Sequence, residues 1–239
     1  MVDYRWFVTS NCGMGHTGGA PYAYEGETRM RRWVLIPLAL AVAVPALGGL
    51  IAIDNTGGAA VGSADPNWTV NSGTAYVTDD STFPFPPWLA NTTTSKWISP
   101  QAGYSGLGSD APGTYNFSTG FDLTGFLPST ASITFRFAAD NALTDVLINS
   151  VSTGIAAPTP PASGYTAFLG PYTIASGFVP GLNTLTFVVS NYSGTRGNPT
   201  GFRVEFLSAT AEVPEPATYA LVGAGLIGLA FLRRRTRRS

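Results

Sequence analysis

The chain has 239 residues, a formal net charge of −1, one Cys (Cys12) and one His (His16). Both lie in the first 29 residues, so region 54–212 lacks the side chains for Ser-His-Asp or Cys-His catalysis and for a His-ligated zinc. The same region holds ten acidic and four basic residues, a net charge of −6, which disfavours nucleic acid as a partner because phosphate binding needs a basic surface. We therefore expect no enzyme activity and no nucleic-acid partner.

Residues 1–29 show no hydrophobic periodicity and precede a segment that has the features of an export signal. Export signals stand at the N-terminus of a chain. We therefore expect residues 1–29 to be a misannotated, disordered extension and Met30 to be the true first residue.

Residues 30–53 have the pattern of a signal peptide or signal anchor. Arg31 and Arg32 precede an uncharged apolar stretch, and a basic segment before an apolar one is typical of secretory signals. The basic pair is expected to stay in the cytoplasm. Small residues place a candidate cleavage site after Ala46 or Ala52, and an uncleaved transmembrane helix is the alternative.

Region 54–212 is rich in Thr, Ser, Gly, Asn and aromatic residues, and its pattern is that of β-strands. Apolar residues alternate with polar ones in 133–137 and 202–206, as in strands with one buried face, and 184–190 is β-branched and aromatic. Turn residues separate roughly eight such runs. We predict an all-β, antiparallel, jelly-roll-like sandwich between an N-terminal signal or anchor helix and a C-terminal membrane helix.

Three segments of this region resemble the galactose-binding-like jelly rolls. They are FRFAADN at 135–141, VLIN at 146–149 and GLNTLTFVV at 181–189. The chain departs from the family where Ser150 stands in place of the expected glycine after Asn149. The resemblance implies glycan binding as a tendency of the family.

Candidate binding residues lie in loops of the predicted sandwich. Trp88 follows a Pro-rich stretch, and Trp88 with Tyr104 is the candidate glycan-binding pair, although aromatic residues also fill cores. Asp140 and Asn141 are weak candidates for Ca²⁺ because they offer oxygen ligands, while an Asx-turn explains them without a metal. No other cofactor is expected.

The last 27 residues, 213–239, combine a turn motif, an apolar run and a basic end. Pro214, Glu215 and Pro216 precede the uncharged run 217–232. The basic residues that follow are Arg233, Arg234, Arg235, Arg237 and Arg238. Arginines beside an apolar run mark the cytoplasmic side of a membrane, so a transmembrane helix is predicted at 217–232.

This order of features resembles the PEP-CTERM sorting signal of exported bacterial proteins. The resemblance implies export, recognition by an exosortase and cleavage near the motif. We expect a membrane-anchored surface or extracellular-matrix protein with a structural or adhesive role in an exopolysaccharide layer. It would be associated with the inner membrane during sorting and would then lie at the cell surface or in the matrix. A glycan-binding module is the alternative, and a carboxylate-dependent glycoside hydrolase is a second one.

Overall fold

The computed structural model describes residues 48–104, 109–157, 164–194, 197–214 and 218–237. Several sequence predictions fall on other residues. Those on 1–29, Arg31 and Arg32, Glu215 and Pro216, and Arg238 lie outside the described residues, as does most of the predicted signal segment.

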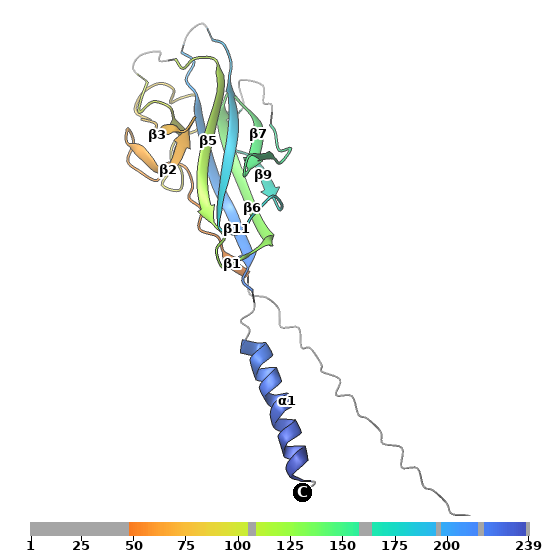
Figure 1. Cartoon of the computed structure of the whole chain (residues 1–239). Coiled ribbons are helices and arrows are strands. Elements are labelled where there is room, and N and C mark those ends of the chain that lie inside the picture. The colour runs from red at the N-terminus through yellow and green to blue at the C-terminus, as the bar shows by residue number, and fades with distance from the viewer. Residues whose placement is uncertain (1–47, 105–108, 158–163, 195–196, 215–217, 238–239) are drawn as a thin grey trace, which may run out of the picture. The chain divides into compact units, whose positions relative to one another are not determined.

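The described residues form an antiparallel β-sandwich, as predicted, and a C-terminal helix (Figure 1). The eleven strands within this part of the chain are β1 (Gly48–Leu50), β2 (Ala64–Val70), β3 (Gly73–Val77), β4 (Ile98–Ser99), β5 (Gly113–Asp122), β6 (Leu127–Asp140), β7 (Ala142–Ile148), β8 (Val151–Ser152), β9 (Leu169–Ile174), β10 (Leu182–Asn191) and β11 (Gly201–Glu212). They follow one hydrogen-bonded path, β8-β7-β10-β5-β2-β3-β4-β11-β6-β9, with β1 paired to β11.

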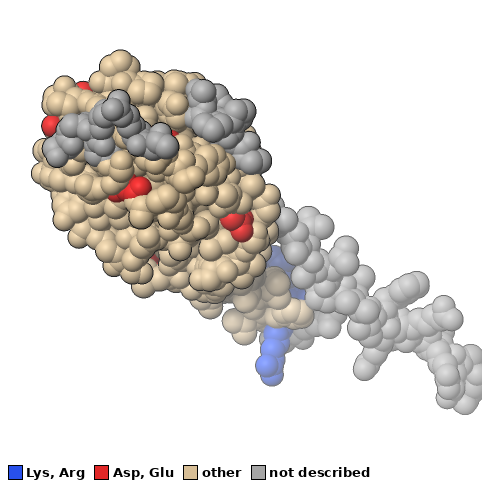
Figure 2. All heavy atoms as spheres, turned by 90° about the horizontal axis from the view of Figure 1, so that it is seen from above, with Lys and Arg blue, Asp and Glu red and all other residues tan. Residues whose placement is uncertain are grey.

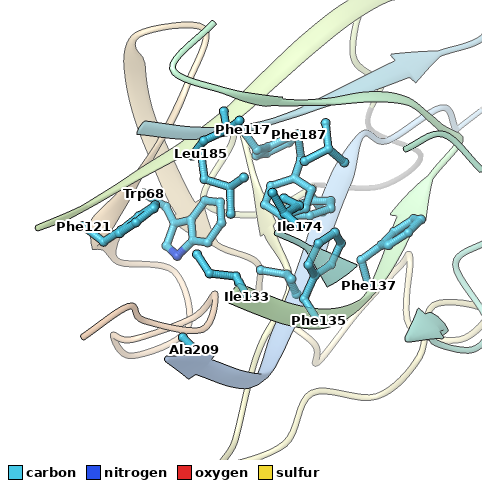
Figure 3. Packing of buried hydrophobic residues seen from close by; sticks show 14 of the residues in the cluster. Trp68, Phe117, Phe121, Ile133, Phe135, Phe137, Ile174, Leu185, Phe187 and Ala209 are labelled. Atoms are coloured by element: carbon cyan, nitrogen blue, oxygen red, sulfur yellow. The ribbon is translucent and has the colours of Figure 1, made fainter. Parts of the chain in front are cut away.

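This path folds over on itself into two layers that enclose one core. Phe187 of β10 lies 4.6 Å from Phe202 of β11 and 5.2 Å from Phe135 of β6, measured between ring centroids. Neither strand is a hydrogen-bonded neighbour of β10, so these contacts join opposite layers. Trp68 of β2 also packs among these aromatic rings (Figure 3), and all four side chains are almost completely buried.

Two hairpins turn on an Asn-Ser pair. Asn71 and Ser72 connect β2 to β3, and Asn149 and Ser150 connect β7 to β8, each with positive φ at both residues. Two positive φ angles in a two-residue loop define a type I′ turn, which usually takes Asn-Gly. Serine therefore occupies the position where this turn usually has glycine, and the turn still forms.

The sequence pattern predicted one buried face for β11, and this was wrong. Val204 points into the main core, but Arg203 is also fully buried and Glu205 is 5% exposed. A second apolar cluster covers this outer face; its most buried members are Trp88, Trp97, Tyr104 and Ala138. The cluster lies over the sheet because the segment before β4 folds back across it, and local periodicity carries no information about that long-range contact.

The C-terminal helix α1 (Thr218–Thr236) ends in Arg233, Arg234 and Arg235, which lie in its last turn. Among the described residues, no helix is both long enough and apolar enough to cross a membrane. This differs from the transmembrane helix predicted at 217–232, because the uncharged part of α1 is short and the arginines belong to the same helix.

Candidate functional site

A small cavity of about 160 Å³ lies where β6 ends. It is lined by Phe83, Pro84, Pro87, Trp88, Asp140, Asn141, Tyr165, Gly197, Asn198 and Pro199. The structure thus brings one predicted glycan-binding residue together with both predicted Ca²⁺ residues. Tyr104, the other predicted glycan-binding residue, does not line this cavity.

Asp140 is the last residue of β6 and the only acidic residue that lines the cavity. Its side chain accepts hydrogen bonds from Trp88 Nε1 at 2.8 Å and from Asn141 Nδ2 at 2.6 Å. Burial raises the pKa of Asp140 to about 7, and the hydrogen bond from Trp88 offsets only part of this effect. The carboxyl group therefore changes charge near neutral pH.

Asn141 connects the end of β6 to the end of β10. Its side-chain Oδ1 accepts a hydrogen bond from the Tyr192 backbone amide at 2.7 Å. The backbone amide of Asn141 donates to the Ser190 carbonyl at 3.2 Å. These contacts hold the Asn141 side chain beside Asp140. No group of three or more His, Cys, Asp or Glu side chains gathers anywhere in the described residues, and the Ca²⁺ site stays a prediction.

Trp88 and Tyr104, the candidate glycan-binding pair, are both buried. Trp88 is 4% exposed and stacks on Trp97 with 4.3 Å between ring centroids, and Tyr104 is 3% exposed. Only a small part of the Trp88 ring faces the cavity. The Pro-rich sequence indicated a surface position, but a turn closed by a hydrogen bond from the Trp88 amide to the Pro84 carbonyl directs the indole inward.

Tyr104, a member of the second apolar cluster, makes buried hydrogen bonds through its hydroxyl group. Its hydroxyl lies 2.6 Å from Asp110 Oδ2 and 2.9 Å from the Thr200 carbonyl. Burial, followed by the nearby charge of Asp110, raises the pKa of Tyr104 far above its usual value. The side chain is therefore a neutral hydrogen-bonding group of the interior.

Glu205 belongs to a buried ionic network on the same face of the sheet. It accepts hydrogen bonds from Arg136 Nε and Nη2 at 2.9 and 2.6 Å and from Ser95 Oγ at 2.7 Å. Burial acts to raise the pKa of Glu205, but the bonds from Ser95 and Arg136 outweigh it and lower the pKa. Arg203 donates to Ser95 Oγ at 2.7 Å and to the Ala90 carbonyl at 2.6 Å, so the network holds the covering segment on the sheet.

Sequence reasoning missed Tyr165 and Asn198 as cavity residues. Both lie in irregular segments, and Asn198 is fixed by a hydrogen bond from its Nδ2 to the Tyr192 carbonyl at 2.6 Å. They reach Trp88 and Asp140 only through the fold, and nothing in their local sequence distinguishes them from other loop residues. The one usable signal was that an aromatic ring near Trp88 could be accessible to a ligand. Tyr165, which is half-buried, is such a residue.

The residues after β11 carry the predicted sorting motif. Val213 and Pro214 directly follow the last strand and are exposed, and α1 begins at Thr218. The family model described as the PEP-CTERM protein-sorting motif matches residues 212–235. The chain carries a PEP-CTERM motif. This confirms the resemblance drawn from the tail, and the match covers the tail alone.

Comparison with solved structures gives distant likenesses. A CBM35 module from Paenibacillus barcinonensis matches with a TM-score of 0.33 and 18% identity over 59% of this chain and 93% of that one. A family 35 carbohydrate-binding module from an environmental isolate has a TM-score of 0.25 and 20% identity over 49% and 86% of the two chains. A Paenibacillus sp. cycloisomaltooligosaccharide glucanotransferase complexed with cycloisomaltoheptaose has a TM-score of 0.28 and 14% identity over 52% and 15%.

Likenesses at these TM-scores say nothing about what this chain binds. No curated protein matches the chain.

Proposed function

We propose that this chain is an exported bacterial surface protein with a structural or adhesive role in an exopolysaccharide layer, and that an exosortase cleaves it near its PEP-CTERM motif. One observation carries the proposal: the match to the sorting motif begins at residue 212, where β11 ends. Cleavage after this point would release a sandwich with every described strand intact. All the described strands therefore lie before the proposed cleavage point.

The surface of the domain suits an extracellular matrix. The region 54–212 has a net charge of −6. On the face drawn in Figure 2, the described part of the domain shows separate acidic residues and no cluster of basic ones. Such a surface keeps the protein soluble and gives no attraction to polyanions.

The sorting proposal is tested by substituting the motif in the full chain. We expect the wild-type protein, produced in a host that contains an exosortase, to reach the surface without its arginine-rich end. The double variant Pro214→Ala/Glu215→Ala should retain that end. The variant Asp122→Asn, at the exposed last residue of β5, serves as the control and should behave as the wild type. Identical processing of all three proteins would contradict the role of the motif.

A second candidate function is the binding of a single sugar unit in the cavity beside Asp140. The cavity combines a carboxyl group, two amide side chains (Asn141 and Asn198) and the ring of Tyr165. A few polar groups in a partly apolar pocket are typical of sites for small ligands. Its volume of about 160 Å³ is smaller than the roughly 300–1,000 Å³ of drug-sized pockets, which limits the ligand to about one sugar ring.

A glycan array with the mature protein tests this second function. We expect Asp140→Asn and Asn198→Ala each to weaken binding about tenfold, since a hydrogen bond to a charged or polar group of the site contributes about 1.4 kcal/mol or more. Asp122→Asn is again the matched control. Equal binding by all variants, or no binding to any glycan, would remove this second function and leave the structural one. Trp88→Ala is unsuitable because it deletes a buried core side chain.

A further inference from the structure

The first described strand lies inside the segment that the sequence pattern assigns to the export signal. Residues 30–53 form that segment, and β1 occupies Gly48–Leu50 within it. β1 pairs antiparallel with the end of β11, with Gly48 opposite Glu212 and Leu50 opposite Thr210. The end of the apolar run is therefore part of the folded domain.

The packing around β1 is that of an integral strand. Ile51 is 5% exposed within the main core, and its amide donates to the Ala209 carbonyl at 2.9 Å. A Cβ atom added at Gly49 would lie 2.7 Å from Phe126 Cε1 and 3.3 Å from Val213 Cγ2. The backbone of Gly49 is thus packed so closely that a larger residue does not fit without movement of its neighbours.

The residues after β1 continue along β11. Asn55 Oδ1 accepts a hydrogen bond from the Phe206 amide at 2.7 Å, and Thr56 Oγ1 accepts one from the Val204 amide at 3.1 Å. Cleavage after Ala52 would leave these two contacts in the mature protein but would remove β1 and Ile51. Three residues at the end of β11 would then lose their pairing with β1 and keep only β6 as a neighbouring strand, and the core would lose a buried side chain.

We propose that the export signal is removed on the N-terminal side of β1, after Ala43 or Ala46, and that β1 is the first strand of the mature protein. The inference rests on the export proposed above. In the reaction, water hydrolyses one peptide bond, so the alanine carbonyl becomes a carboxylate and Val44 or Leu47 gains a free amine. The candidate site after Ala52 is excluded because it cuts within the folded domain.

The sequence around the two remaining sites fits this assignment. Signal cleavage sites have small residues at the first and third positions before the cut. The tripeptide 41–43 is Ala-Val-Ala, with alanine at both positions, and 44–46 is Val-Pro-Ala, with valine at the third position. The tripeptide 50–52 is Leu-Ile-Ala, with the larger leucine at that position. The two observations, packing and residue size, therefore agree.

The test uses the full chain in an exporting bacterial host, with N-terminal sequencing and intact mass of the protein outside the cytoplasmic membrane. We expect the wild-type protein to begin at Val44 or Leu47. The double variant Ala43→Tyr/Ala46→Tyr should be exported with its signal still attached. Ala52→Tyr, whose side chain is exposed, is the control and should be processed as the wild type.

Three outcomes would overturn the inference: an N-terminus at Ile53, a signal retained in the wild type, or processing blocked by Ala52→Tyr alone. Protease treatment of spheroplasts separates this failure from failure of the proposed function. A protein that protease reaches but that begins elsewhere overturns only the cleavage position. A protein that protease cannot reach overturns the proposed export and this inference with it.

Discussion

Asp140 makes the stability of the domain depend on pH in a range where few other groups titrate. Its pKa is raised from 3.8 to about 7 by burial, and the side chain is 6% exposed. The folded state therefore holds a proton that the unfolded chain releases, and the free energy of unfolding falls as pH rises from about 4 to about 7. At 1.36 kcal/mol per pKa unit, the full difference is about 4 kcal/mol.

Between pH 5 and pH 8, the same two pKa values give a loss of about 3 kcal/mol in the free energy of unfolding. The region 54–212 contains no His, so its side chains offer no ordinary group that titrates in this range. The carboxylates with lowered pKa, such as Glu205, give stability that is lost only at more acidic pH. The expected decline between pH 5 and pH 8 thus belongs to Asp140.

Urea unfolding of the mature protein at several pH values between 5 and 8 measures this decline. We expect Asp140→Asn to remove the slope, at a constant cost of about 1 kcal/mol. Trp88 and Asn141 donate to different oxygens of the carboxyl group, and an amide has an acceptor at only one of these two positions. Asp122→Asn, at an exposed carboxylate with a lowered pKa, should keep the wild-type slope. A wild-type stability that stays level or rises over this range, or a slope that persists in Asp140→Asn, would refute the reasoning.

Three further substitutions test the packing by chemical denaturation. Gly201→Ala should destabilise the domain by about 1–3 kcal/mol, because a Cβ atom there would overlap the indole ring of Trp88; unchanged stability would mean that the indole is not packed as described. Ile51→Ala should cost about 2–5 kcal/mol, since Ile51 is 5% exposed, and a loss below about 0.5 kcal/mol would show that the strand before it is dispensable. Ser150→Gly should stabilise the domain by up to about 1 kcal/mol because φ of Ser150 is +66°, and a loss of stability would contradict the assigned turn.

Strands with regular alternation were predictable because their signal is local. The runs at 133–137 and 202–206 lie inside β6 and β11, and the run at 184–190 lies inside β10. β1 was missed because Gly48–Leu50 continues an apolar run, and a short strand at the end of such a run has no pattern of its own. Its pairing with β11 joins residues more than 150 positions apart, which local sequence cannot reveal.

The candidate site was predicted in part, for a similar reason. Asp140 and Asn141 stand at a visible turn between two strands, and the structure places both in the cavity. For Trp88 the sequence left surface binding and core packing equally open, and the rings of Trp97 and Tyr104 pack against it through contacts that depend on the fold. The polar pattern of Arg203 and Glu205 indicated a solvent face, yet the two residues form a buried network with Ser95.

Intact mass of the protein recovered from the cell surface tests the central claim most directly. If the chain is an exported protein sorted through its PEP-CTERM motif at 212–235, the surface form should end near Pro214 and lack Arg233, Arg234 and Arg235. A surface form that retains these arginines in a host with an exosortase would contradict the account, and so would a chain found only in the cytoplasm.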